Sequence, residues 1–390
     1  MVLICEPECV GINHSDTNIG FLSLFEKIFD EIIFIAEINH LAILKKNINK
    51  KNIKFIDWET PDISLPDYLR HKSDIEFIER LFVLCNENRI EKLILLSCSA
   101  SKLYSVKKML RKFKNINVYI LMHGILEQLT TPRPSINPMY YISNVNNLFN
   151  LPFWFGFPFL FSNSDKIKYL LLSENNNENL IKKFPKLKLY TDVIGLPYIF
   201  FKDYNYKPFK KGKVRFGIFG YTHKGKGGDL LFKLAEEIKK NQKIENAEFV
   251  LIGSIYGNDV IVNDSVEIIS RNKPLSRNDF DKYAKEIDYA VYFYPSYSYQ
   301  FTTSGAFFDA ISYQKPVIVF KNNFFKQYFN LIGDIGYMCD DYQNMFDTVK
   351  YISQNLPMKE YAFQKNNIKK LREILSIDAL AEKAKKVLNK

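Results

Sequence analysis

The sequence predicts an α/β protein with two Rossmann-like domains that face a central cleft. Short apolar runs of β-type residues alternate with amphipathic segments of helical periodicity, which is typical of parallel sheets covered by helices. The alternation occurs twice, and a basic, proline-containing stretch at 201–212 separates the two series. The chain has 390 residues, 47% of them hydrophobic, so it can build two sizeable cores. Ligands of such domains bind at the carboxyl ends of the strands, where we look for functional residues.

The first series predicts a domain over residues 1–200. Helical periodicity is clearest at 74–87 and 102–112. Apolar runs predict strands at 2–5, 32–36, 53–56, 92–97, 118–123, 168–173 and 190–194.

The second series predicts a domain over 213–375, joined to the first by a linker at 201–212. A charged helical tail covers 359–390, and its last helix, 376–390, can cross back to the first domain. Apolar runs predict strands at 214–219, 247–252, 266–269, 289–293, 316–320 and 336–338. Helices are predicted near 228–241, 277–286, 304–313 and 341–355.

The formal net charge of +11 and the pI of about 9.1 suggest an anionic partner. The sequence has no zinc-knuckle, basic-zipper or RNA-recognition signature, so we expect no nucleic acid. The basic residues are scattered apart from a denser run at 202–215, which leaves a phosphorylated substrate or an anionic membrane surface. The most apolar stretch, 148–161, contains prolines and is too short to span a bilayer.

The cysteines and the N-terminus favour a cytoplasmic protein. The five cysteines form no CxxC pair and are odd in number, as expected for reduced thiols. The first residues lack the basic and apolar regions of a signal peptide. We therefore expect a cytoplasmic protein that can be peripheral on the inner face of the membrane.

A glycine-rich turn at 220–228 opens the second series. It follows the strand 214–219 and precedes a helix. The free N–H groups of such a helix start, with the charges of Lys224 and Lys226, suit a diphosphate. The turn is neither GxxxxGK[ST] nor GxGxxG, so a solvated turn whose lysines face water is the alternative.

A second helix start follows the strand 289–293 and an aromatic loop. Ser304 is a favourable N-cap, and Gly305 allows a ligand to approach the backbone closely. A phosphate can bind these N–H groups while Asp309, about one turn into the helix, reaches ribose hydroxyls. The alternative is an ordinary capped helix with a solvated aspartate.

This order of parts resembles the nucleotide-binding half of GT-B glycosyltransferases, above all the family-4-like group of bacterial surface-glycan enzymes. The resemblance is carried by 217–227, 249–253, 271–276, 288–296, 304–310 and 315–317, with looser similarity at 169–173 and 193–197. It implies a UDP- or GDP-sugar donor, which is a substrate, so that no cofactor is expected. The donor contacts that it implies are Gly220, Tyr221, His223, Lys224, Lys226, Arg271, Ser304, Gly305, Ala306 and Asp309.

The sequence departs from that family at two points. Retaining members carry a Glu-x7-Glu pair, whereas here Phe301 precedes Asp309 at this spacing. The usual arginine of the diphosphate-binding pair is replaced by Tyr221, for which His223 or Lys224 can substitute. The first departure favours inversion. We expect no metal, because no acid pair or His/Cys cluster with metal-ligand spacing argues for a catalytic cation.

Two histidines of the first series are the candidate catalytic residues. The loop 11–14 is similar to the Gly-x-His loop of inverting plant-type transferases, which makes His14 the candidate general base, oriented by Asp16 or Glu6. His123 closes a strand and resembles the histidine that contacts the transferred sugar in family-4-like enzymes. For His14 the alternative is a loop histidine without a role.

Asn13 and Glu127 are the candidate acceptor-binding residues, because they lie beside these histidines in the chain. The aromatic segment 152–161 is expected in the core, or alternatively at a surface that touches membrane or a lipid acceptor.

The sequence therefore predicts a hexosyl- or other glycosyltransferase of surface polysaccharide synthesis. It would move a sugar from a nucleotide donor, bound by the second domain, to a glycan or lipid-linked glycan, bound by the first. A sugar-nucleotide 2-epimerase of the same fold is one alternative, and a non-catalytic nucleotide- or carbohydrate-binding protein is another.

Overall fold

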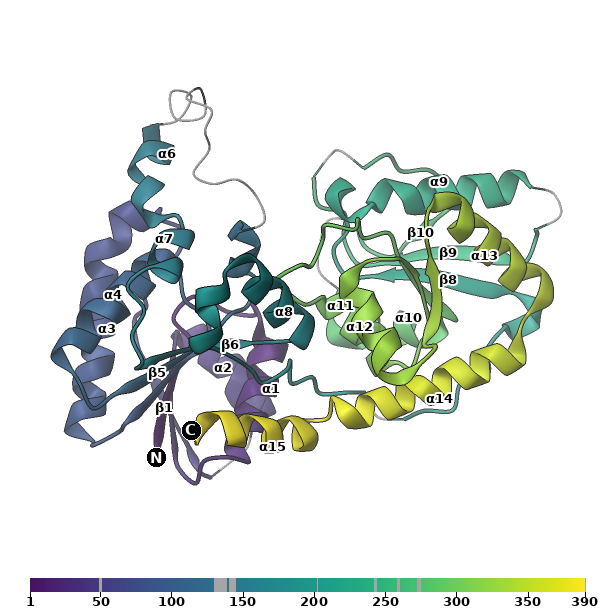
Figure 1. The fold of residues 1–390 in the computed structure, drawn as a ribbon. Coiled ribbons are helices and arrows are strands. Elements are labelled where there is room, and N and C mark those ends of the chain that lie inside the picture. The colour runs from purple at the N-terminus through teal and green to yellow at the C-terminus, as the bar shows by residue number, and fades with distance from the viewer. Residues whose placement is uncertain are drawn as a thin grey trace. The chain divides into compact units, whose positions relative to one another are not determined.

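A computed structural model describes residues 1–48, 51–129, 139, 145–201, 203–241, 244–257, 260–271 and 275–389. The chain forms two compact units (Figure 1). The first contains Met1–Tyr198, Gln300–Thr303 and Ile377–Lys390, and the second contains Ile199–Tyr299 and Ser304–Ser376. Three predicted segments fall partly outside the described residues: the linker at 202, the family-like stretch 271–276 at 272–274, and the last helix at 390.

The first unit is built on a seven-stranded parallel sheet in the order β3-β2-β1-β4-β5-β6-β7. Its central strand β1 pairs with β2 on one side and β4 on the other, so that Leu3 lies between Ile33 and Leu93. All residues of β1 and β2 are buried, because helices cover both faces of a parallel sheet. The strands are β1 (Val2–Cys5), β2 (Ile32–Ala36), β3 (Ile53–Asp57), β4 (Lys92–Leu95), β5 (Asn117–Leu121), β6 (Ile167–Leu171) and β7 (Thr191–Val193).

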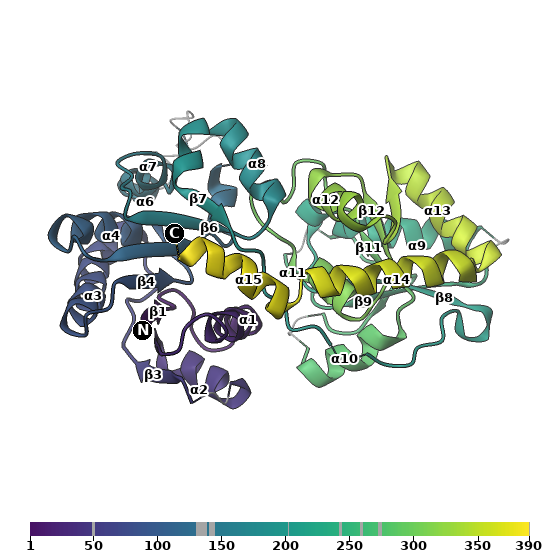
Figure 2. The same cartoon turned by 60° about the horizontal axis from the view of Figure 1, so that its bottom comes forward.

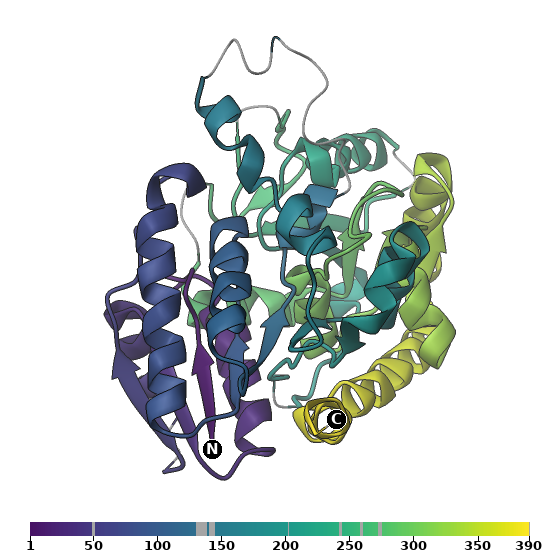
Figure 3. The same cartoon turned by 60° about the vertical axis from the view of Figure 1, so that its left-hand side comes forward.

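Right-handed crossovers place the helices of the first unit on both faces of its sheet. α1 (Ser15–Glu26) and α2 (Ile38–Asn47) lie on one face, where α15 (Ile377–Leu388) packs on α1 and β7 (Figure 2). α3 (Asp67–Glu87) and α4 (Ala100–Lys112) lie side by side on the other face (Figure 3). The remaining helical segments are η1 (Ile125–Leu129), α6 (Val145–Phe149), η2 (Leu151–Phe153), α7 (Gly156–Leu160), α8 (Glu174–Lys183) and η3 (Pro185–Leu189).

The aromatic segment 152–161 belongs partly to the core and partly to the surface. Phe155 and Phe159 are fully buried in the same hydrophobic core as α3 and α4. The Phe161 side chain, in contrast, is 63% exposed. The segment is therefore divided between core and surface, and its contact with membrane or a lipid acceptor stays a prediction.

The second unit is built on a six-stranded parallel sheet in the order β10-β9-β8-β11-β12-β13. Buried aromatic side chains of neighbouring strands stack along it, as Phe216 does on Phe249 and Tyr289. The strands are β8 (Val214–Phe219), β9 (Ala247–Ile252), β10 (Glu267–Ile268), β11 (Tyr289–Tyr292), β12 (Val317–Phe320) and β13 (Gly336–Cys339).

Helices cover both faces of this sheet as well. α9 (Gly228–Lys240) and α13 (Tyr342–Asn355) pack together on one face. α10 (Arg277–Glu286), α11 (Gly305–Ser312) and α12 (Asn323–Ile332) lie on the other (Figure 1). The remaining helical segments are η4 (Lys210–Gly212), η5 (Lys224–Lys226) and α14 (Met358–Ile374).

The predicted fold class is confirmed. Both sheets are parallel. In each sheet the first strand is internal, the next two strands are added on one side of it, and the remaining strands are added on its other side. Each predicted strand is present, and predicted and observed ends differ by at most two residues. All five cysteines are buried and unpaired. Of the helices that the structure describes, none combines the length and the hydrophobicity that a membrane span requires.

Candidate functional site

The first unit has a cavity at the switch point of its sheet, where β1 and β4 lie side by side and the crossovers diverge. Polar residues follow the carboxyl ends of the strands here: Glu6 after β1, Ser97 after β4 and His123 after β5. They line a cavity of about 430 Å³ together with His14. The cavity is large enough for a sugar-sized ligand.

His14 and His123 meet in this cavity. Their ring centroids are 4.7 Å apart, with the ring planes at 84°. Burial, and then the nearby His14, lower the pKa of His123 to about 4. The Nδ1 atom of His123 is buried and has no hydrogen-bond partner among the described residues. His123 is therefore neutral at physiological pH and suits a neutral hydrogen-bonding ligand.

The loop that carries His14 is fixed by buried contacts. His40 is fully buried on α2, and its Nδ1 donates to the carbonyl oxygen of Gly11 at 2.7 Å. The Nε2 atom of His40 then accepts from Asn18 Nδ2 at 2.9 Å, and Asn18 also donates to Glu6 at 3.1 Å. Glu37 accepts from the Gly11 N–H at 3.3 Å. The role of His40 could not be predicted from the sequence, because the hydrogen bond joins residues far apart in the chain.

His14 itself occupies the left-handed backbone region, with φ of 52°, directly before α1. This conformation is uncommon for residues other than glycine and asparagine, and it is often found at functional sites. It is compatible with the predicted role of His14 as a base. Asn13 and Asp16 are exposed on either side of it.

Glu6, the other residue predicted to orient His14, is engaged elsewhere. Its carboxylate accepts from the Glu8 N–H at 2.9 Å, from Asn18 and from the Ser97 hydroxyl. None of the hydrogen bonds among the described residues joins Glu6 to His14. Glu6 therefore holds the end of β1 against the end of β4.

A buried cluster of charges supports the same cavity. Lys102 Nζ lies 2.9 Å from Asp74 Oδ1 and 3.0 Å from Glu8 Oε1. Arg70 contacts Asp67 at 2.6 Å, Asp74 at 3.3 Å and Glu8 at 3.4 Å. Lys102 and Asp74 are fully buried, so these residues must be paired to remain charged. This cluster could not be predicted from the sequence, because a lysine such as Lys102 on a helix rich in basic residues is expected to be exposed to solvent.

Two carboxylates of this charge cluster line the cavity, namely Glu8 and Asp67. Burial raises the pKa of Glu8, but Lys102 and Arg70 outweigh this effect and hold it below its ordinary value. Burial raises the pKa of Asp67. With Glu6, three carboxylates face the cavity and only Arg70 among its lining residues is a lysine or arginine. This lining favours hydroxyl donors over anionic groups.

Glu127 lies in η1, four residues beyond His123, and its side chain accepts a hydrogen bond from a backbone N–H group. Its carboxylate accepts from the Phe301 N–H at 3.4 Å, and burial raises the pKa of Glu127. Asn176 Nδ2 donates to the carbonyl oxygen of Thr302 at 3.0 Å in the same segment. Phe301 is 2% exposed in the core of the first unit, so a hydrophobic contact occupies the position of the missing first glutamate.

In the second unit, the glycine-rich turn and the start of α11 lie side by side. A Cβ atom placed on Gly220 would lie 3.7 Å from Ala306 Cβ. Gly220 has φ of 80°, and a Cβ on Gly253 would meet its carbonyl oxygen at 1.9 Å. The close approach of the ends of β8 and β9 therefore requires glycine at 253. The structure brings together the two turns that we predict to bind phosphate.

The lysines and histidine of the turn differ in their contacts. His223 Nδ1 accepts from the Gly225 N–H at 3.1 Å, which fixes the turn. Lys226 Nζ lies 3.5 Å from the Tyr221 carbonyl oxygen. Lys224 is exposed, and the Tyr221 side chain is exposed as well.

At the start of α11, Ser304 is the predicted N-cap. Its hydroxyl accepts from the Phe307 N–H at 3.3 Å and is 3.0 Å from the Tyr294 hydroxyl. A Cβ on Gly305 would meet nothing within 4 Å, so the backbone there is open. Among the described residues no hydrogen bond engages the N–H groups of Gly305 and Ala306. These N–H groups and the positive end of the helix dipole suit an anion.

Asp309 lies on the second turn of α11, where its Oδ1 is 3.9 Å from Arg277 Nη1. Arg277 also contacts Asp281 at 3.0 Å. Arg271 is exposed and directly precedes residues outside the described part of the chain. Within the described residues, no group of three or more His, Cys, Asp or Glu is arranged to hold a metal ion.

No protein-family model matches the sequence, and a search of curated proteins finds no match. Solved structures do match over the whole chain. HepE of Anabaena in complex with UDP-glucose has a TM-score of 0.60 and 11% identity, covering 100% of this chain and 99% of that one. WaaG, a glycosyltransferase involved in lipopolysaccharide biosynthesis, has a TM-score of 0.61 and 10% identity, covering 99% of each chain.

A trehalose-6-phosphate protein from E. coli bound with UDP-2-fluoro glucose has a TM-score of 0.61 and 9% identity, covering 98% of this chain and 97% of that one. At such identities the similarity establishes the fold. The chain has the GT-B fold of two Rossmann-like domains.

Proposed function

We propose that this protein is a glycosyltransferase that moves a sugar from a nucleotide-sugar donor to a glycan or lipid-linked glycan in surface polysaccharide synthesis. The main support is the pairing of two phosphate-type turns at the carboxyl ends of β8 and β11, where Gly220 and Ala306 adjoin. The similar structures of HepE and of the E. coli protein hold UDP-glucose and UDP-2-fluoro glucose. We assign the chain to the family-4-like group on its sequence motifs.

The donor, of UDP or GDP type, binds the second unit in this proposal. Its diphosphate lies between the 220–228 turn and the N–H groups of Gly305 and Ala306. Asp309 accepts from the ribose hydroxyls, which would replace its distant contact with Arg277. Lysines and helix N-termini neutralise the leaving diphosphate, so that no metal is needed.

The acceptor hydroxyl binds beside His14 in the first unit. His14 removes its proton as the hydroxyl oxygen attacks the anomeric carbon, and the bond from that carbon to the diphosphate breaks with inversion. The electron pair leaves on the nucleoside diphosphate. Neutral His123 contacts the donor sugar, Asp16 orients His14, and Asn13 and Glu127 contribute to the acceptor site. The protein acts in the cytoplasm, peripheral on the inner face of the membrane.

Release of free nucleoside diphosphate tests this function. UDP- and GDP-sugars are first screened by thermal shift, and the binding donor is incubated with an acceptor panel with and without EDTA. Free diphosphate and an inverted anomeric configuration by NMR support the proposal. An isomerised donor would indicate an epimerase, donor binding without turnover a binding protein, and loss of turnover in EDTA a metal requirement.

A further inference from the structure

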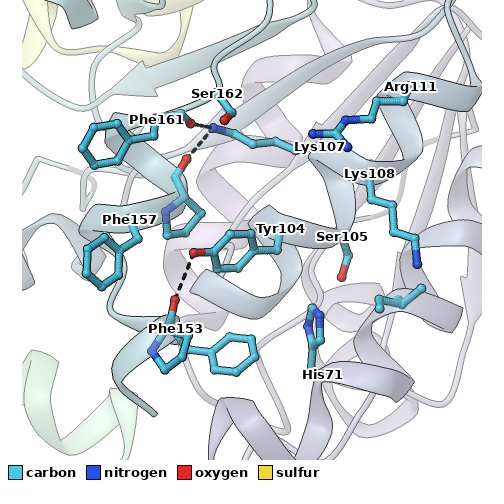
Figure 4. Close-up of a pocket in the computed structure, with 13 residues that line it drawn as sticks. His71, Tyr104, Ser105, Lys107, Lys108, Arg111, Phe153, Phe157, Phe161 and Ser162 are labelled. Atoms are coloured by element: carbon cyan, nitrogen blue, oxygen red, sulfur yellow. Dashed lines mark hydrogen bonds between the residues drawn. The ribbon is translucent and has the colours of Figure 1, made fainter. Parts of the chain in front are cut away.

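A second cavity of the first unit lies outside the histidine site, between α4 and the segment formed by η2 and α7 (Figure 4). Its volume is about 690 Å³. One wall is aromatic and contains Phe153, Phe157 and Phe161. The facing wall carries Lys108 and Arg111.

The aromatic wall is fixed to α4 by hydrogen bonds. The Tyr104 hydroxyl donates to the carbonyl oxygen of Pro152 at 3.0 Å. Lys107 Nζ donates to Asn163 Oδ1 at 2.9 Å and to the carbonyl oxygens of Pro158 and Phe161. Lys107 is therefore engaged in holding the wall, and burial lowers its pKa to about 8. These hydrogen bonds fix the aromatic wall of the cavity relative to α4.

The charged side chains that line the cavity are all basic. Lys108 and Arg111 lie one helical turn apart and share a face of α4. Neither has an ion-pair partner among the described residues, and no aspartate or glutamate lines the cavity. Lys112, one turn beyond Lys108 on the same helix, does not line the cavity and is paired with Glu79 at 2.9 Å. The two cavity cations are thus available to an anion.

Apolar surface continues beyond the cavity. Phe161 at its edge is exposed, as are Leu148 and Phe149 of α6, which leads directly into η2. Phe149 stacks on Tyr68 of α3 at 5.4 Å, so α6 is attached to the same side of the unit. An apolar cavity with a cationic wall and exposed apolar side chains around it fits an anionic amphiphile.

The cavity adjoins the histidine site. Phe153 lines both cavities, and His71 of the second is bonded to Ser101 of α4 at 2.9 Å, next to Ala100 of the first. A ligand that passes Phe153 can therefore occupy both. The histidine cavity is lined by carboxylates and suits hydroxyls, whereas the second cavity suits phosphate and hydrocarbon.

We propose that the second cavity binds the phosphate-bearing lipid of a lipid-linked acceptor. Lys108 and Arg111 bind the phosphate, and the aromatic wall binds the start of the hydrocarbon chain. The acceptor sugar then lies toward His14. This assignment rests on the proposed function for the sugar, but the lipid site can be tested without turnover.

Dodecyl phosphate, below its critical micelle concentration, is a suitable probe for the full-length protein. The chain has two tryptophans, and Trp154 lies in the aromatic segment, 5.2 Å from Phe157 between ring centroids. The Trp58→Phe variant leaves Trp154 as the reporter. We expect saturable binding of dodecyl phosphate with a change in Trp154 fluorescence, and much weaker binding of dodecyl maltoside and of inorganic phosphate.

Two charge variants make the test specific. Lys108→Gln with Arg111→Gln should weaken dodecyl phosphate binding by about tenfold or more, the effect of losing charge-assisted contacts. Lys112→Gln with Lys114→Gln removes the same charge from the last residue of α4 and from the loop just beyond it, and should change the affinity by less than about twofold. All four side chains are exposed, so folding should be retained.

Three results would overturn the site. Equal losses in both charge variants would indicate diffuse attraction, as at a bulk anionic membrane. If dodecyl maltoside bound as tightly as dodecyl phosphate, the phosphate would make no contact of importance. If inorganic phosphate bound as tightly, the same would hold for the hydrocarbon chain. Failure of the proposed function shows separately, as absent nucleotide-sugar binding while dodecyl phosphate still binds.

Discussion

His14 and His123 share one cavity but have different environments, and this difference supports the separate roles that we propose for them. His123 is half-buried, with its Nδ1 atom covered, and is kept neutral by a pKa of about 4. His14 is exposed at the cavity rim, on a loop that buried residues hold in place. A base must exchange protons with bound acceptor and with solvent, so the greater exposure of His14 favours it over His123 for the role that we propose.

Replacing His14 tests the base directly. His14→Asn is preferable to alanine, because asparagine tolerates the left-handed backbone at this position. We expect kcat to fall by roughly 10²-fold or more, since general base catalysis is lost, while nucleotide binding is retained. Kinetics and calorimetry measure both. A variant with a nearly normal rate would remove His14 from the base role.

Lys226 carries the charge that we assign to the donor diphosphate. Lys226→Ala should weaken nucleoside diphosphate binding by roughly 1–3 kcal/mol, the effect of losing a charge-assisted hydrogen bond. Lys240→Ala is the matched control, because it removes a charge from the far end of α9, where Lys240 pairs with Glu236. Calorimetry should show unchanged affinity for the control only, and a wild-type value for Lys226→Ala would contradict the assignment.

Asp309 is assigned to the ribose rather than to the chemistry. Asp309→Ala should therefore raise the donor KM more than it lowers kcat, since ribose contacts are similar in the ground and transition states. Steady-state kinetics with varied donor give both constants. A large loss of kcat with the KM unchanged would make Asp309 part of the reaction.

At the scale of elements, α2 holds the loop that carries His14, although no residue of α2 lines the cavity. His40→Ala removes the hydrogen-bond partner of the Gly11 carbonyl oxygen and leaves Asn18 with Glu6 as the acceptor of its amide group. We expect a loss of about 1–3 kcal/mol in the free energy of unfolding and a lower kcat, with nucleotide affinity unchanged.

Urea unfolding and kinetics check this prediction. Lys46→Ala, exposed on the same helix, is the control and should match the wild type. If His40→Ala loses stability but keeps its rate, His40 is a structural residue only.

The sequence predicted the elements well because of how they are buried. Strands such as Ile32–Ala36 are covered on both faces and read as continuous apolar runs. The glycine-rich turn and the cap at Ser304 were also visible, since both depend on local backbone requirements.

What the sequence did not show depends on distant contacts. The charge cluster of Lys102 and Asp74, the bond from His40 to Gly11, and the segment Gln300–Thr303 in the first unit each join residues far apart in the chain. The aromatic segment divides into buried and exposed residues for the same reason. Its pattern is apolar throughout, and only the packing of α7 on α4 decides which rings are covered.

For the whole molecule, His123 makes stability depend on pH. Its pKa is about 4 in the folded protein and near the ordinary value of 6.5 when unfolded. The unfolded chain therefore binds more protons between these values, and the folded state loses stability as the pH falls from about 6.5 to about 4. The full effect is at most roughly 3 kcal/mol at the acid end.

Urea unfolding at pH 7 and pH 5 measures this dependence. The His123→Phe variant lacks the titrating group, so its loss of stability between the two pH values should be smaller than that of the wild type. An identical loss in both proteins would contradict the burial of a neutral His123.

The burial of every native cysteine has a practical consequence for chemical labelling. Burial raises the pKa of all five thiols, that of Cys339 to about 11, so at neutral pH they are protonated as well as covered and should react slowly with maleimides. A cysteine introduced at an exposed position of each unit would react first, with the native five left in place. A donor and an acceptor dye attached in this way would report the separation of the two units in solution, and its change when nucleotide binds.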